Sequence, residues 1–213
     1  LKVTGVGESD IVEAVEKQLE AIPALDLGYC IRNGDVDVRL AGPQVAVDEA
    51  AGVVRAALGD CIVSEDRRII EEVIVQMLTE RGEWLATAES CTGGTIANRI
   101  TDVSGASRVF GHGWVTYANE AKQQHLGVSA ELFEKHGAVS EEVAREMAEG
   151  AVTRSMATMA VSVTGIAGPG GSEFKPEGRV CFGVARTGHD TIVETVEFGA
   201  IGRAKVRKAT VGH

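Results

Sequence analysis

Cysteine is scarce in this 213-residue sequence, and its few copies lie far apart. The four cysteines, Cys30, Cys61, Cys91 and Cys181, form no CxxC pair, and the five histidines lack metal-ligand spacing. This distribution predicts neither a zinc site nor a disulfide framework, and we expect no metal and no cofactor. Widely spaced, unpaired cysteines are typical of the reducing cytoplasm.

The sequence also lacks long apolar runs and an excess of basic residues. No run of about 18 apolar residues occurs, so no membrane span is predicted, and the first residues show no signal-peptide pattern. The net charge of −10 argues against a nonspecific nucleic-acid binder, because such proteins are usually basic. The 44% hydrophobic and 24% charged content is ordinary for a globular protein.

Residues 1–64 predict a small α+β domain with the order strand, helix, strand, strand, helix, strand. We expect the first helix to open at Asp10 with a capping box, to turn Val12 and Val15 inward, and to end at Pro23. Asn33-Gly34 lies between two alternating runs and predicts a tight hairpin. Nothing in this domain resembles a catalytic site, and we interpret it as a spacer or a dimerisation element.

Residues 65–213 predict a larger α/β domain, in which strands alternate with helices and a hairpin follows. This pattern indicates a mixed sheet covered by helices in three layers. We expect Asn119 to cap a short helix over residues 120–126 and Ser140 to cap a longer one over residues 141–154. Three polar segments, residues 90–94, 116–122 and 164–172, follow predicted strands and could line one pocket.

The segment from Trp84 to Ala97 contains the strongest chemical signal. A short apolar run, which predicts a strand, leads through Ser90, Cys91 and Thr92 to a helix. A hydroxyl or thiol at such a turn can be a nucleophile, and the unpaired N–H groups of the helix start can hold an oxyanion. The alternative is that Ser90 is only a helix N-cap.

Four segments resemble the CinA C-terminal family, whose members are also known as nicotinamide-nucleotide amidohydrolases. They are Ala88-Glu89-Ser90-Cys91-Thr92-Gly93-Gly94, Thr116-Tyr117-Ala118-Asn119-Glu120-Ala121-Lys122, Gly137-Ala138-Val139-Ser140 and Thr164-Gly165-Ile166-Ala167-Gly168-Pro169. Residues 1–64 resemble the KH-like middle domain of full-length CinA proteins. The resemblance therefore implies that the N-terminal nucleotide-binding domain of those proteins is absent from this chain.

The resemblance implies hydrolysis of the carboxamide of nicotinamide mononucleotide (NMN), which gives nicotinate mononucleotide and ammonia. It identifies Ser90 and Lys122 as a Ser/Lys pair. Such a pair needs a neutral amine, and partial burial near a helix start would favour that form of Lys122. The N–H groups of Cys91, Thr92 and Gly93 would then stabilise the oxyanion. Without the resemblance, Lys122 would be interpreted as a solvated surface lysine.

The remaining site predictions concern orientation and the substrate phosphate. Tyr117 could orient the lysine or stack on the pyridine ring, and the alternative is a core aromatic. Backbone N–H groups of the glycine-rich loop could bind the phosphate, and arginine suits phosphate through its fork of donors. The predicted substrate-binding residues are Asn119, Thr164, Gly165, Gly168, Gly170, Gly171, Arg203 and Arg207.

Two other functions are compatible with the sequence. Cys91 adjoins Ser90 and could itself be the nucleophile. The domain could also be a non-enzymatic module associated with competence or DNA damage, although its acidic charge argues against direct DNA binding. We expect a homo-oligomer, most simply a dimer. The family's helix after the arginine segment is expected to be missing or disordered here, because the sequence stops at His213.

Overall fold

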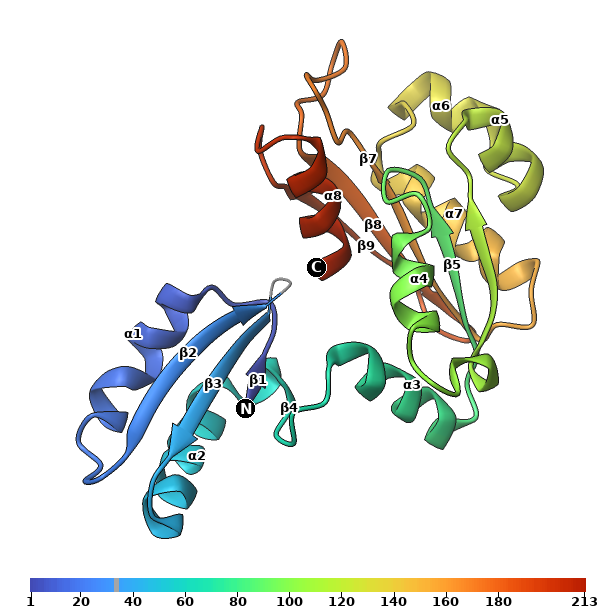
Figure 1. Cartoon of the computed structure of the whole chain (residues 1–213). Helices are drawn as coiled ribbons and strands as arrows, with labels where there is room; N and C mark the ends of the chain where they lie inside the picture. The colour runs from blue at the N-terminus through green and yellow to red at the C-terminus, as the bar shows by residue number, and fades with distance from the viewer. Residues whose placement is uncertain (33–34) are drawn as a thin grey trace. The chain divides into compact units, whose positions relative to one another are not determined.

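The computed structural model describes residues 1–32 and 35–213 and divides into two compact units (Figure 1). Unit 1 comprises residues 1–73 with 212–213, and unit 2 comprises residues 74–211. Each unit has a hydrophobic core of its own.

Unit 1 is a four-stranded antiparallel sheet with the strand order β2-β3-β1-β4. Its elements are β1 (Lys2–Val3), α1 (Glu8–Leu19), β2 (Asp26–Arg32), β3 (Asp35–Ala41), α2 (Gln44–Leu58), a 3₁₀ turn (Gly59–Cys61) and β4 (Ile62–Ser64). This is the predicted order of strands and helices. The predicted Asn33-Gly34 turn lies outside the described residues, but the strands before and after it pair antiparallel.

The core of unit 1 forms between the two helices and the sheet, with Ile11 and Val15 of α1 facing Val36 and Val38 of β3. Two details of the first helix were predicted wrongly. Helix α1 begins at Glu8 after Gly7, without a side-chain cap, and it ends at Leu19. Asp10 therefore lies inside the first turn, and the buried row begins at Ile11, one residue before the predicted Val12.

Unit 2 contains a five-stranded mixed sheet with the order β6-β5-β7-β8-β9. Its strands are β5 (Leu85–Glu89), β6 (Phe110–Val115), β7 (Met159–Gly165), β8 (Arg179–Arg186) and β9 (Ile192–Glu197). Strand β5 is parallel to both β6 and β7, whereas β8 and β9 complete the sheet as an antiparallel hairpin. The mixed sheet confirms the predicted fold class.

The helices of this part of the chain complete the three layers (Figure 1). They are α3 (Ile70–Arg81), α4 (Thr95–Thr101), a 3₁₀ turn (Ala106–Arg108), α5 (Asn119–Ala121), the π-helical turn η3 (Lys122–Leu126), α6 (Ala130–His136), α7 (Glu141–Thr153) and α8 (Arg203–Gly212). Helix α3 runs across the division between the units.

Small side chains on the central strands allow the helices to pack closely on the sheet. Met147 of α7 packs against Ala86, Ala88 and Ala160 in one core cluster. A second cluster joins α3 and α4 to Leu85, and a third joins α8 to β7 and β8. Because β5 lies between two parallel neighbours, all five of its residues are buried.

The helix ends include one confirmed cap and one correction. Ser140 caps α7, and its hydroxyl accepts a hydrogen bond from the N–H of Val143. Asn119 is not a cap, because the N-cap of α5 is Ala118. The arginine segment itself is helical, as α8, which begins at Arg203 and ends at Gly212, whereas the expectation for a helix after that segment stays a prediction. In the described ranges, no helix is long and apolar enough to cross a membrane.

Candidate active site

A pocket of about 170 Å³ lies at the carboxyl ends of the three parallel strands. This is where ligands bind in open α/β sheets, and all three segments predicted to line one pocket contribute to it. Its lining residues are Ser90, Cys91, Tyr117, Asn119, Lys122, Ala138, Val139, Thr164, Gly165, Ala167 and Arg203. The volume is similar to that of an engineered cavity of about 150 Å³ that binds benzene.

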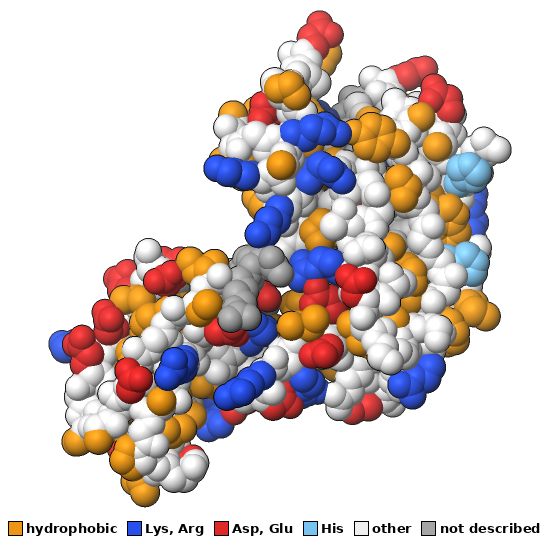
Figure 2. Space-filling model, viewed as in Figure 1, with side chains coloured by type: hydrophobic (Ala, Val, Ile, Leu, Met, Phe, Trp, Pro, Cys, Tyr) orange, Lys and Arg blue, Asp and Glu red, His pale blue; other side chains and the backbone are white. Residues whose placement is uncertain are grey.

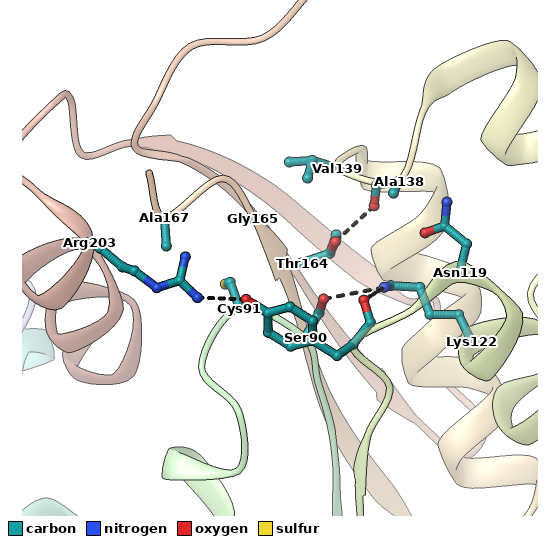
Figure 3. Close-up of a pocket in the computed structure, with 11 residues that line it drawn as sticks. Ser90, Cys91, Asn119, Lys122, Ala138, Val139, Thr164, Gly165, Ala167 and Arg203 are labelled. Atoms are coloured by element: carbon teal, nitrogen blue, oxygen red, sulfur yellow. Dashed lines mark hydrogen bonds between the residues drawn. The ribbon is translucent and has the colours of Figure 1, made fainter. Parts of the chain in front are cut away.

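Ser90 and Lys122 meet on the floor of this pocket (Figure 3). The Lys122 Nζ lies 3.2 Å from the Ser90 Oγ. It also donates to the backbone carbonyl of Thr116 at 2.9 Å and lies 3.4 Å from that of Tyr117. Both side chains are buried, with 8% of Ser90 and 1% of Lys122 exposed. The structure thus brings the two predicted catalytic residues into contact.

Burial lowers the pKa of the Lys122 amine, against smaller opposing effects of Cys91 and Glu120. A neutral amine has two N–H donors and one lone pair. When the carbonyls of Thr116 and Tyr117 accept the two donors, the lone pair is left for the hydroxyl proton of Ser90. The local geometry therefore suits a lysine that acts as a base toward Ser90.

The orientation of Lys122 depends on an unusual turn. Lys122 begins the π-helical turn η3, and its carbonyl accepts from the N–H of Val128 at 3.3 Å. Gly127 ends the turn with a φ of 77°. Single π-turns are rare and frequently lie at functional sites. This turn, which the sequence pattern did not predict, directs the base inward from a short surface helix.

Ser90 is fixed by backbone contacts and by a buried glutamate that precedes it. The Ser90 N–H donates to the carbonyl of Val163 on β7 at 3.0 Å. The fully buried carboxylate of Glu89 accepts from the N–H groups of Gly94, Ile96 and Ala97 at 2.8–3.1 Å. Glu89 therefore neutralises the N-terminus of α4, although the sequence predicted these donors to be open.

Backbone contacts of the turn reduce the number of N–H groups that could stabilise an oxyanion. The N–H of Gly93 donates to the carbonyl of Ser90 at 3.1 Å, so it closes a turn and is not free. Within residues 1–32 and 35–213, the N–H groups of Cys91 and Thr92 donate no hydrogen bond to another residue. Of the three predicted oxyanion donors, these two therefore remain available, and of the two residues Cys91 lines the pocket.

Cys91 is poorly suited to be the nucleophile. Its side chain is 4% exposed, and burial raises the pKa of the thiol to about 11. The thiolate is the reactive form of cysteine, so at neutral pH this thiol remains protonated. Burial is the largest influence on this thiol, so the alternative with Cys91 as the nucleophile is disfavoured.

Tyr117 and Arg203 form a pair at the mouth of the pocket. The side chain of Tyr117 is 58% exposed, so it is not a core aromatic. Its hydroxyl accepts from Arg203 Nη2 at 2.6 Å, and Arg203 Nη1 donates to the carbonyl of Gly168 at 3.0 Å. Only the backbone carbonyl of Tyr117 approaches Lys122. The phenol therefore belongs with Arg203 and not with the lysine.

The glycine-rich loop does not present the predicted anion site. The N–H of Gly170 donates to the carboxylate of Glu177 at 2.6 Å, and the same carboxylate packs against Gly168. A carboxylate thus accepts one of the loop N–H groups that was predicted to bind the phosphate. Gly168, Gly170 and Gly171 do not line the pocket, whereas Gly165 does. Thr164 also lines it, and its hydroxyl donates to the carbonyl of Ala138 at 2.8 Å.

Arg207 lies behind the nucleophile turn and not in the pocket. Its Nε donates to the carbonyl of Cys91 at 3.0 Å, and its Nη2 donates to that of Thr92 at 2.9 Å. The guanidinium is committed to these carbonyls, so its predicted role as a phosphate ligand is not supported. Of the two arginines, Arg203 is the one that reaches the pocket.

Sequence comparisons identify proteins that are similar to this chain. The family described as "CinA C-terminal domain" matches residues 67–213. A CinA-like protein of Akkermansia muciniphila is 46% identical over 194 residues, which are 91% of this chain and 47% of the relative. A CinA-like protein of Chlorobium phaeobacteroides is 42% identical over 93% of this chain and 50% of its own length. The chain thus spans about half the length of these curated relatives.

The solved structures that resemble this chain carry similar names. The crystal structure of the competence/damage inducible protein CihA from Agrobacterium tumefaciens has a TM-score of 0.64 and 45% identity, covering 66% of this chain and 86% of that one. A competence-damaged protein (CinA) superfamily structure from Escherichia coli has a TM-score of 0.64 and 34% identity, covering 70% and 88%.

Proposed function

This chain belongs to the CinA family, and from that premise we propose that its C-terminal domain hydrolyses the carboxamide of NMN to nicotinate mononucleotide and ammonia. The observation that carries the proposal is the buried lysine amine 3.2 Å from a serine hydroxyl at the end of a parallel strand. Such a pair activates serine for attack on an amide carbon.

The first half of the reaction forms an acyl-enzyme. Lys122 takes the proton of the Ser90 hydroxyl as Oγ attacks the carboxamide carbon. The N–H groups of Cys91 and Thr92 stabilise the oxyanion of the tetrahedral intermediate. Lys122 then gives its proton to the amide nitrogen, the C–N bond breaks, and ammonia leaves the nicotinoyl ester on Ser90.

The second half returns the enzyme to its starting state. Lys122 takes a proton from water as the water oxygen attacks the ester carbon, and the same two N–H groups hold the second oxyanion. Collapse breaks the bond to Ser90, which recovers its proton from Lys122. Nicotinate mononucleotide is released.

Arg203 is the group best suited to the substrate phosphate. The pocket has room for the pyridine carboxamide near Ser90, which leaves the ribose and the phosphate toward the mouth. There the Arg203 guanidinium is exposed and makes two neutral contacts, with a carbonyl and with the Tyr117 hydroxyl. Arginine binds phosphate through parallel N–H donors. Basic side chains gather over α8, the helix that carries Arg203 (Figure 2).

The test is ammonia release from NMN without added metal, for the parent and three variants. We expect Ser90→Ala and Lys122→Ala each to lower kcat by at least about 10²-fold, because each removes one member of the pair. Cys91→Ser keeps the parent rate, because the thiol is protonated and its backbone N–H is retained. A Ser90→Ala variant with the full rate would contradict the mechanism.

Two outcomes of the same experiment favour the other candidate functions. Loss of activity in Cys91→Ser with retention in Ser90→Ala would indicate a cysteine amidase. A folded parent with no ammonia release from NMN would favour a binding module, which titration of NMN by calorimetry then tests directly.

A further inference from the structure

Arg207 has no place in the reaction just described, yet it is bound to the two residues beside the nucleophile. Its side chain is partly buried on α8, more than a hundred positions along the chain from the turn. Its Nε and Nη2 donate to the carbonyls of Cys91 and Thr92 at 3.0 and 2.9 Å. The planar guanidinium of Arg207 therefore binds two consecutive backbone carbonyls.

The geometry of the peptide bond extends this contact to the N–H group of Thr92. In a trans peptide the C=O and the following N–H point in opposite directions across one plane. The peptide with the Cys91 carbonyl carries the N–H of Thr92. Because Arg207 fixes that carbonyl on the α8 side, it fixes the Thr92 N–H away from α8. The N–H of Thr92 is one of the two donors left for the oxyanion.

The glycine of the turn makes this approach possible. A side chain at Gly93 would place its Cβ 3.3 Å from the Nη2 of Arg207, and the φ of Gly93 is 64°. Gly93 thus supplies both the turn and the room for the guanidinium. Arg207 also holds the next peptide, in which the Thr92 carbonyl shares a plane with the Gly93 N–H. That N–H donates to the carbonyl of Ser90 and closes the turn.

We propose that Arg207 is a positioning residue, which orients and polarises the peptide of the oxyanion donor Thr92 from behind. A cation on a carbonyl strengthens the N–H of the same peptide as a donor, because hydrogen bonds in a chain polarise one another. The effect is greatest when negative charge develops on the other side, as it does in the tetrahedral intermediate. This role rests on the proposed function, since it requires acyl transfer at Ser90.

The alternative is that Arg207 only tethers α8 to the rest of unit 2, and kinetics separates the two roles. We compare Arg207→Lys, which keeps the charge but loses the fork, with Arg207→Met, which loses both. Lys208→Met is the matched control, because it removes an exposed cation from the next position of the same helix. Arg203→Met is the control for the substrate phosphate.

Ammonia release from NMN and thermal unfolding are measured for each variant. Arg207→Met is expected to lower kcat about 10- to 100-fold with KM changed less than threefold, a part of the loss seen when an oxyanion donor is removed. Arg207→Lys falls between it and the parent. Lys208→Met leaves both constants unchanged, and Arg203→Met mainly raises KM. A folded Arg207→Met with the parent kcat overturns the proposal, as does a loss confined to KM.

Two additions keep the result interpretable. If Arg207→Met does not fold, Arg207→Lys decides alone, and a parent-like kcat in that folded variant overturns the proposal. If the parent releases no ammonia from NMN, the labelling rate of Ser90 by a fluorophosphonate replaces kcat. In labelling, Lys122 takes the hydroxyl proton as the Ser90 Oγ bonds to phosphorus, fluoride leaves, and the phosphonyl oxygen takes the position of the oxyanion.

The labelling rate tests the positioning role of Arg207 separately from the proposal that NMN is the substrate. Labelling at least about tenfold slower in Arg207→Met than in the parent would support the positioning role even where NMN is not the substrate. Equal labelling rates in the two proteins would overturn the role, and so would a parent whose Ser90 is not labelled.

Discussion

Lys122 is a charged residue by type, yet its side chain is almost completely buried. Long buried side chains of this kind normally need a compensating partner, and the described structure offers Lys122 only carbonyl and hydroxyl oxygens. Burial is accordingly the main cause of the lowered pKa of this amine. The same burial that disfavours a charged Lys122 thus favours the neutral amine that the proposed base requires.

The pH dependence of the reaction tests this link. Only the neutral amine can take the serine proton, so kcat/KM is expected to be low in acid and to rise with pH through one ionisation. Because the pKa of Lys122 is lowered, that ionisation lies below the range of exposed lysines. The measurement is kcat/KM for NMN across the neutral and alkaline range, with unfolding followed at each pH.

Lys122→Arg is the matched variant for this measurement. Arginine keeps the positive charge at all these pH values, so its activity is expected to stay low with no rise. A parent profile that is flat, or that falls as pH increases, would contradict the assignment of Lys122 as the base.

At the scale of elements, helix α7 holds the turn that carries Lys122. Gly150 of α7 lies against the carbonyl group of Leu126, the last residue of the π-helical turn, and a Cβ at residue 150 would overlap that carbonyl oxygen. The absence of a side chain therefore sets the distance between α7 and η3. Through η3, it sets the place of the lysine.

Gly150→Ala and Gly52→Ala are expected to have opposite effects. Both glycines lie inside helices, but a Cβ at Gly52 of α2 meets nothing within 4 Å. Gly52→Ala should therefore stabilise the protein by about 0.5–1 kcal/mol. Gly150→Ala should destabilise it by about 1–3 kcal/mol through overpacking and should also lower kcat. Denaturant unfolding and NMN kinetics measure the two effects.

A result of equal sign for the two glycines would show that helix propensity, and not contact with η3, decides at residue 150. A destabilised Gly150→Ala that keeps the parent kcat would show that the register of η3 does not control the lysine.

The elements that the sequence predicted well are those specified by local pattern. Alternation and an apolar run located β3 and β5, and Ser140 marked the start of α7. The π-helical turn was missed because it depends on Gly150, which is distant in sequence from Leu126. Asn119 was assigned as a cap because asparagine prefers that position, yet the chain enters α5 one residue earlier.

The residues of the candidate site also include some that the local sequence predicts and some that only the fold explains. Ser90 and Lys122 lie in recognisable segments and were identified from the sequence. Glu89 looked like the last residue of a strand, and only the fold turns its carboxylate onto the start of α4. Arg207 was assigned to a phosphate because free arginines suit anions, whereas in the fold it binds two carbonyls. The charge of an arginine does not show which hydrogen-bond acceptor lies beside it in the folded protein.

At the scale of the whole molecule, every residue that lines the pocket belongs to unit 2. The lining runs from Ser90 to Arg203, and the unit comprises residues 74–211. The solved relative from Agrobacterium tumefaciens is covered over 86% of its length by 66% of this chain. That relative therefore consists mostly of the part that resembles this chain, and whether unit 2 folds without unit 1 is a question for experiment.

A fragment comprising residues 67–213, the range that matches the family, tests this autonomy. We expect it to fold cooperatively and to release ammonia from NMN with the kcat and KM of the whole chain, because it retains Ser90, Lys122 and Arg203 together with the helices that position them. Thermal unfolding and steady-state kinetics of the two proteins provide the comparison, with Ser90→Ala in the fragment as its inactive control. A folded fragment with a much lower kcat would mean that unit 1 contributes to catalysis through contacts outside the pocket lining. A fragment that does not fold would instead assign to unit 1 a part of the stability of the catalytic domain.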